Sequence, residues 1–168
     1  MVTIRLMLPS EWALHREVRL QSLLESPHAF GSTYVSEAKR SDDEWQNIIQ
    51  TALARGNNHV FLAEADAVIC GLVWCKLSPT DSNLAEIFQM WVNPKYRGAS
   101  IGQQLLKVAT ECASQHGVSI IRLEVSGSNL PAMAFYQSQG FQPIDSAGPQ
   151  DGSNTEACAQ LMQLNLND

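Results

Sequence analysis

The hydrophobic and polar positions of the first sixty residues follow two different periods. Residues 3–9 alternate between apolar and polar, which predicts a strand. Apolar residues then recur at helical spacing, so we expect a helix from about Glu11, capped by Ser10, and a second helix after Ser41. Residues 26–34 contain Pro and Gly and are predicted to be a loop. The expected apolar positions are Leu14, Val18, Leu20 and Leu24 in the first helix and Trp45, Ile48, Ile49, Ala52 and Leu53 in the second.

The middle of the chain is rich in strand-forming residues. Residues 59–65 and 67–77 are separated by almost nothing, which predicts a hairpin near Asp66, and residues 84–92 predict a further strand. Strict alternation in this last strand would divide its side chains between two faces of the sheet. One face would carry Glu86, Phe88, Met90 and Val92, and the other Ala85, Ile87, Gln89 and Trp91.

The rest of the chain predicts two helices and three strands. A helix is expected from about Ser100 to His116, stopped by Gly117, and a short one over residues 129–139. Strands are expected over 119–125, from Phe141 and over 160–167. The order β-α-α-β-β-β-α-β-α-β-β predicts one α/β (α+β) domain over residues 1–168 with a mixed, mostly antiparallel sheet. The strand–helix–strand passage within residues 84–126 predicts a parallel pair.

Composition excludes several classes of protein. With 168 residues, 45% of them hydrophobic, the chain fits an ordinary globular domain, and its net charge of −6 argues against a nucleic-acid binder. No apolar run approaches the roughly 18 residues of a membrane span, and the N-terminus does not look like a secretory signal. The four cysteines form no CxxC pair, so we expect a cytoplasmic protein without a metal.

The turn before the helix that begins near Ser100 is a candidate anion site. Its sequence is RGASIG, from Arg97 to Gly102, and the first turn of a helix leaves about four N–H groups without partners. It is not a P-loop, since Gln103 and Gln104 stand where Lys and Ser or Thr are required, and GxGxxG is absent. A plain structural turn is the alternative.

Two motifs resemble those of the GCN5-related N-acetyltransferases. MWVNPKYRGASIG resembles the acyl-CoA turn of that family, and NLPAMAFYQSQGF resembles its second signature, Asn-x-x-Ala-x-x-Phe-Tyr followed by Gly-Phe. The element order agrees over nearly the whole chain. The departure is Ser100, which replaces a small position that is usually Gly. A serine at a helix start does not need positive φ, so we expect Ser100 to act as the N-cap.

The resemblance implies the GNAT fold, with a splayed pair of parallel strands, and transfer of an acetyl group from acetyl-CoA to an amine. Tyr136 would protonate the leaving thiolate, and Glu86 would act as the base, directly or through water. The side chain of Phe135 is expected to pack in the core, and Asn129 is expected to cap a helix as well as bond pantetheine. The expected acetyl-CoA contacts are Met90, Val92, Arg97, Gly98, Ala99, Ser100, Ile101, Gly102, Gln103, Asn129 and Tyr136.

The same resemblance implies that the first helical pair and its loop, residues 19–37, wall the acceptor site. Phe30 and Tyr34 would line the cleft, and Glu37 would attract a cationic amine of a small molecule or a peptide. By the habit of the family, a homodimer is a further expectation. A CoA-binding module without activity is the alternative, and the intact Tyr136 argues against it.

Overall fold

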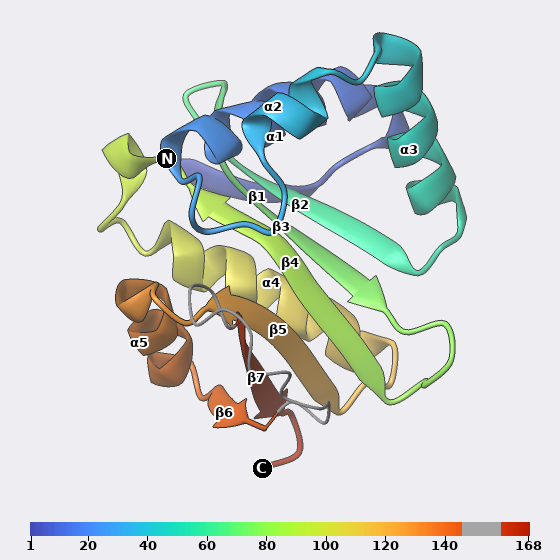
Figure 1. Ribbon diagram of the computed structural model, residues 1–168. Helices are drawn as coiled ribbons and strands as arrows, with labels where there is room; N and C mark the ends of the chain where they lie inside the picture. The colour runs from blue at the N-terminus through green and yellow to red at the C-terminus, as the bar shows by residue number, and fades with distance from the viewer. Residues whose placement is uncertain (146–158) are drawn as a thin grey trace, which may run out of the picture.

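The computed structural model describes residues 1–145 and 159–168. Seven strands form a mixed sheet in the order β1-β2-β3-β4-β5-β7-β6, with helices on both faces (Figure 1). β4 and β5 are parallel and all other pairs are antiparallel, as the sequence predicts. The strands are β1 (Val2–Leu6), β2 (Asn58–Ala65), β3 (Val68–Leu77), β4 (Leu84–Val92), β5 (Ile120–Ser126), β6 (Gln142–Ile144) and β7 (Ala159–Asn165).

The helices lie close to their predicted places, with one addition. The loop predicted over residues 26–34 is followed by a short helix, α2, in which Thr33 Oγ1 accepts a hydrogen bond from the Ser36 N–H. Pro94–Tyr96 and Pro9–Glu11 form single 3-10 turns, so the first α-helix begins one residue later than expected. The α-helices are α1 (Trp12–Glu25), α2 (Tyr34–Ala38), α3 (Asp42–Ala54), α4 (Ile101–Gln115) and α5 (Leu130–Ser138).

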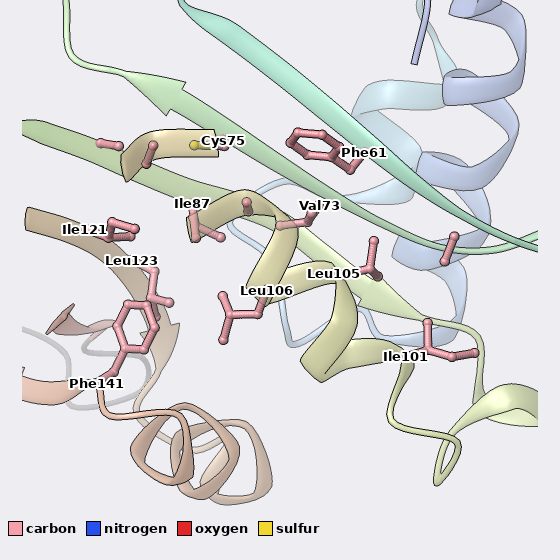
Figure 2. Close-up of a cluster of buried hydrophobic side chains, with 14 of the residues drawn as sticks. Phe61, Val73, Cys75, Ile87, Ile101, Leu105, Leu106, Ile121, Leu123 and Phe141 are labelled. Carbon is pink, nitrogen blue, oxygen red and sulfur yellow. The ribbon is translucent and has the colours of Figure 1, made fainter. Parts of the chain in front are cut away.

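The larger core lies between α4 and one face of the sheet. Leu105 and Leu106 of α4 pack on side chains from β2 to β5, and Phe141 closes the cluster beside β5 (Figure 2). Each of these three side chains is at most 3% exposed, so each contributes on the order of 2 kcal/mol by burial. This packing holds the start of α4 next to the end of β4.

The smaller core lies on the opposite face, under α1 and α3. Trp45 and Ile49 of α3 are buried as predicted, but the apolar face predicted for α1 is wrong beyond Val18. Leu24 is 62% exposed, whereas His15, Arg19 and Ser22 of α1 are buried. Polar side chains therefore point inward from α1, which is unusual unless they serve a site.

A β-bulge in β4 overturns the predicted alternation. The register passes from Trp74↔Phe88 to Leu72↔Trp91, so β4 contains one extra residue, and Gln89 has φ +54°. The extra residue exchanges the two faces beyond Gln89. Met90 and Val92 therefore lie with Ala85 and Ile87 toward α4, while Trp91 lies with Glu86 and Phe88 toward α1.

Candidate active site

The turn between β4 and α4 exposes the start of the helix. Gly98 has φ +87°, and a side chain there would meet nothing within 4 Å. The first backbone bond of the helix runs from the Gln104 N–H to the Ser100 carbonyl, at 3.0 Å. The preceding N–H groups of Ile101, Gly102 and Gln103 are therefore open to an anion, and the helix dipole favours one there.

Ser100 does not behave as predicted. It adopts φ +60° and ψ 17°, and its hydroxyl makes no capping bond. The left-handed conformation costs a residue other than Gly roughly 1–2 kcal/mol. A glycine, the usual residue of the motif that this turn resembles, would adopt this conformation without that cost, whereas the serine adopts it with strain.

Gly102 faces the protein rather than an open groove. A Cβ at Gly102 would lie 3.4 Å from Phe135 Cζ and 3.6 Å from Met90 Cε. Its lack of a side chain lets α5 pack against α4, and Phe135 also lines the groove beside the turn. The side chain of Phe135 therefore packs against the core, as expected, and also forms part of the groove wall.

The guanidinium of Arg97 has two protein partners. Its Nε donates to the Val92 carbonyl at 2.9 Å, and one terminal nitrogen bonds Glu25 at 2.9 Å. Trp91 Nε1 donates to the same Glu25 carboxylate oxygen at 2.8 Å. The charge of Arg97 is thus held beside the turn, but a phosphate would compete with Glu25 for it.

Beyond Ile87 the two parallel strands separate. The paired residues run from Leu84↔Ile120 to Ile87↔Leu123, so within the described residues the β4 edge from Phe88 to Val92 has no partner in β5. The splayed pair that the sequence predicts is therefore present. It leaves main-chain groups of β4 open to an extended ligand.

Two cavities meet at this splay. The first, of about 940 Å³, runs along the turn and is lined by Val92, Arg97, Gly98 and Gln103. The second, of about 820 Å³, lies under α1, and both volumes are in the range of ligand sites. The walls common to both are Ala29, Phe30, Met90, Asn129, Ala132 and Tyr136.

Tyr136 stands at the junction, on α5. Burial raises the pKa of its phenol to about 12, so the hydroxyl stays protonated at neutral pH. Its ring is held edge-on by Phe135 at 5.3 Å and Phe141 at 5.8 Å between centroids. Asn129 Oδ1 accepts a hydrogen bond from the Ala132 N–H, which confirms the predicted cap and fixes the start of α5.

Comparison with known proteins agrees with this geometry. Residues 19–141 match the model of the acetyltransferase (GNAT) family. The chain belongs to this family. An uncharacterised N-acetyltransferase of Archaeoglobus fulgidus is 30% identical over 107 residues, which cover 61% of this chain and 73% of that protein.

Other relatives differ from this chain in length. A mycothiol acetyltransferase of Saccharomonospora viridis is 30% identical over 92 residues, which cover 51% of this chain but only 30% of that protein. The chain therefore matches about a third of that relative's length. The structure of the PaiA N-acetyltransferase from Thermoplasma acidophilum in complex with coenzyme A has a TM-score of 0.75, with 23% identity and coverage of 98% and 99%. Its likeness supports the GNAT fold.

In this GNAT protein, the cavity under α1 carries carboxylates on its sheet wall. Glu86 of β4 is exposed, lines this cavity and lies opposite Arg122 in the parallel register. Glu124, two residues further along β5, is also exposed and lines the same cavity. The role of Glu86 as base stays a prediction, and Glu124 is a second candidate that sequence analysis missed.

The predicted acceptor residues are only partly brought together. Phe30 lines both cavities and Glu37 lines the one under α1, whereas Tyr34 is outside the described walls of both. The Glu37 carboxylate accepts two hydrogen bonds of 3.1 Å from Arg19. Burial pushes the pKa of Glu37 upward, but Arg19 outweighs it and holds the pKa below its usual range. Arg40 Nη1 also lies 3.6 Å from the Glu37 carboxylate, so a cationic amine would meet a carboxylate already paired with two arginines.

His15 is a further residue of this wall that sequence analysis missed. It is 1% exposed, and its Nε2 lies 3.0 Å from Gln89 Oε1 on the bulge. Nδ1 is buried without a partner among the described residues. Burial lowers the pKa of His15 to about 4, so the ring is neutral. Gln89 thus makes a polar contact with the wall of the cavity under α1.

Among the described residues, no helix is both long and apolar enough to cross a membrane. His28 lines the cavity along the turn and is not among the residues that line the cavity under α1.

Proposed function

We propose that this protein transfers an acetyl group from acetyl-CoA to an amine in a ternary complex. The observation that carries the proposal is the meeting of two cavities at Tyr136. One cavity begins at an uncapped helix N-terminus, which suits a diphosphate, and the other is lined by Glu86 and Glu124. Family membership and the coenzyme A complex of a structural neighbour support the assignment of this donor.

The donor would lie along the first cavity. Its diphosphate would accept hydrogen bonds from the N–H groups at residues 101–103, with Gly98 leaving space for its approach. Its pantetheine arm would pair with the free edge of β4 near Met90 and Val92. Because the Val92 carbonyl is already bonded by Arg97, we assign the pantetheine contact at Val92 to its N–H.

The chemistry needs three groups at the junction. A neutral amine attacks the thioester carbon, the carbonyl oxygen becomes negative and is polarised by a β4 N–H near Val92, and the C–S bond then breaks. The leaving thiolate takes the proton of the Tyr136 hydroxyl. The pKa of Tyr136, about 12, keeps that hydroxyl protonated until the C–S bond breaks. Glu86 or Glu124 would take the amine proton through water.

The acceptor is proposed to be a primary amine of a small molecule or peptide. One relative is named a mycothiol acetyltransferase, and the exposed carboxylates of Glu86 and Glu124 in the cavity suit a cationic amine. Aromatic walls formed by Trp45, Trp74 and Phe88 suit an acceptor with an apolar body.

Release of free CoA across a panel of amines and peptides tests the proposal. Tyr136→Phe should lower kcat by about 10²-fold or more with little change in KM for acetyl-CoA. Ala99→Glu should abolish acetyl-CoA binding by repelling the diphosphate, while Thr51→Glu on the outer side of α3 adds the same charge without effect. Tight acetyl-CoA binding with no turnover on any acceptor would instead support a binding module.

A further inference from the structure

A group of potential metal ligands lies at one end of α4, and the turn at residues 97–102 (the anion turn) lies at the other end. His59 comes from the start of β2, while Cys112 and His116 stand one turn apart at the end of α4. α4 contains 15 residues, so this group lies about 20 Å from the turn along the helix axis. Nothing in the acetyl-transfer chemistry uses it.

The three side chains converge closely. One ligand atom from each lies within 4.8 Å of the other two, and the Cys112 thiol lies beside the His116 ring. The two imidazole rings are 5.0 Å apart between centroids. His59 Nε2 is buried and has no hydrogen-bond partner among the described residues. A buried ring nitrogen without a partner is uncommon in a native fold and points to a missing ligand.

The His116 ring is fixed beside the thiol by its own helix. His116 Nδ1 lies 2.7 Å from the Cys112 carbonyl oxygen and donates to it. A hydrogen bond from one ring nitrogen to a backbone carbonyl is the usual support of a metal-binding histidine, because it sets the tautomer of the other nitrogen.

We propose that His59, Cys112 and His116 bind one zinc-class divalent cation. Two imidazoles and a thiolate favour a borderline-soft metal over Mg²⁺ or Ca²⁺, which prefer oxygen ligands. Tetrahedral zinc, with bonds of about 2.0–2.3 Å, places its ligand atoms about 3.3–3.7 Å apart. The ligand atoms lie up to 4.8 Å apart, so side-chain rotations that move them by about 1 Å bring them to the spacing of one tetrahedral ion. His116 is exposed, so water supplies the fourth ligand.

The metal would join α4 to β2, two elements that are far apart in the sequence. No local pattern in the chain indicates this site, because only the fold brings His59 next to the Cys-x-x-x-His pair. A cation there would stabilise the helix that carries the anion turn at its other end. Its role is thus structural, and it is independent of the acetyl-transfer proposal.

Cobalt binding tests the site directly. Tag-free protein is stripped with a chelator and titrated with Co²⁺, and the expected result is one equivalent bound with a thiolate-to-cobalt absorption band that Zn²⁺ abolishes. Zn²⁺ should also raise the Tm of the wild type. Absence of the band, or of saturation at one equivalent, overturns the proposal.

Variants locate the metal. Cys112→Ser should abolish the thiolate band, and His59→Gln should weaken Co²⁺ binding at least tenfold. Cys70→Ala and His28→Gln remove the same groups elsewhere and should leave the titration unchanged. If a variant fails to fold by circular dichroism, His116→Gln replaces it, since this exposed side chain is not needed for packing. Equal Co²⁺ binding by the wild type and His116→Gln would show adventitious binding and overturn the assignment.

Discussion

Loss of one partner of the Arg19–Glu37 pair should destabilise the protein strongly. The side chains are 4% and 5% exposed, so solvent screens them little. Glu37→Gln leaves the buried Arg19 charge without a carboxylate and should cost about 3–5 kcal/mol. Arg19→Met should cost toward the lower end of this range, because Glu37 keeps Arg40 at 3.6 Å. For a domain of this size a loss in this range corresponds to a fall in Tm of about 6–20 °C. Arg19 also stacks on Phe30 at 4.8 Å, so Arg19→Met loses this contact in addition.

Urea unfolding of four proteins measures the effect: the wild type, Arg19→Met, Glu37→Gln and the double variant Arg19→Met/Glu37→Leu. The double variant should recover most of the loss, since an apolar pair needs no compensation for charge. Lys107→Met is the control, because its partner Glu111 is 56% exposed and the pair contributes less than about 1 kcal/mol. Single variants that lose less than about 1 kcal/mol would refute the reasoning.

The pair also gives a direction with pH. The pKa of Glu37 is held below its ordinary value of 4.5, so the unfolded state binds a proton first as the pH falls. The stabilisation by this carboxylate is therefore complete above pH 4.5 and is lost as the pH falls through the folded-state pKa. Glu37→Gln should remove this part of the acid sensitivity.

Three other changes test separate parts of the structure. Ser100→Gly should raise the free energy of unfolding by up to about 1 kcal/mol by relieving φ +60°, whereas Ser100→Val should lower it, both measured in urea. Gly71→Ala should cost about 1–3 kcal/mol, because its Cβ would lie 3.0 Å from the Trp91 carbonyl oxygen and 3.0 Å from Leu105 Cδ1. His15→Gln should reduce the loss of stability between pH 6.5 and about 4, where unfolded His15 is protonated and folded His15 is not, a difference of about 3 kcal/mol; an unchanged pH profile would contradict the burial of a neutral ring.

The sequence predicted what local patterns encode. Strand and helix order, the parallel pair and the position of the anion turn follow from periodicity and from the residues at Asn93–Gly98, which end a strand and reverse the chain. The capping box at the start of α3 is also a local device, in which Ser41 and Glu44 bond each other's backbone N–H. Such features depend on neighbours in the chain.

The alternation of side chains along a strand could not predict the bulge at Gln89. One extra residue in β4 exchanged the faces of Met90 and Trp91. The residue with positive φ is Gln89 and not a Gly, so the local sequence did not indicate a bulge. The prediction of an apolar inward face for α1 was wrong for a related reason. His15 and Arg19 are buried because Gln89 and Glu37 lie opposite them, and those partners are far away in the sequence. A pattern argument assigns such side chains to the surface.

These departures gather on one wall of the cavity under α1. His15 keeps an unpaired Nδ1, Arg19 keeps an unpaired terminal nitrogen, and Gln89 has a strained backbone, all within the described residues. Each costs stability, and a sequence selected for stability alone would replace them with apolar residues. The other face of β4, which packs against α4, is formed by apolar side chains. The unsatisfied groups therefore favour the α1 side of β4 as the surface that selects the acceptor, with the anion turn serving a donor common to the family.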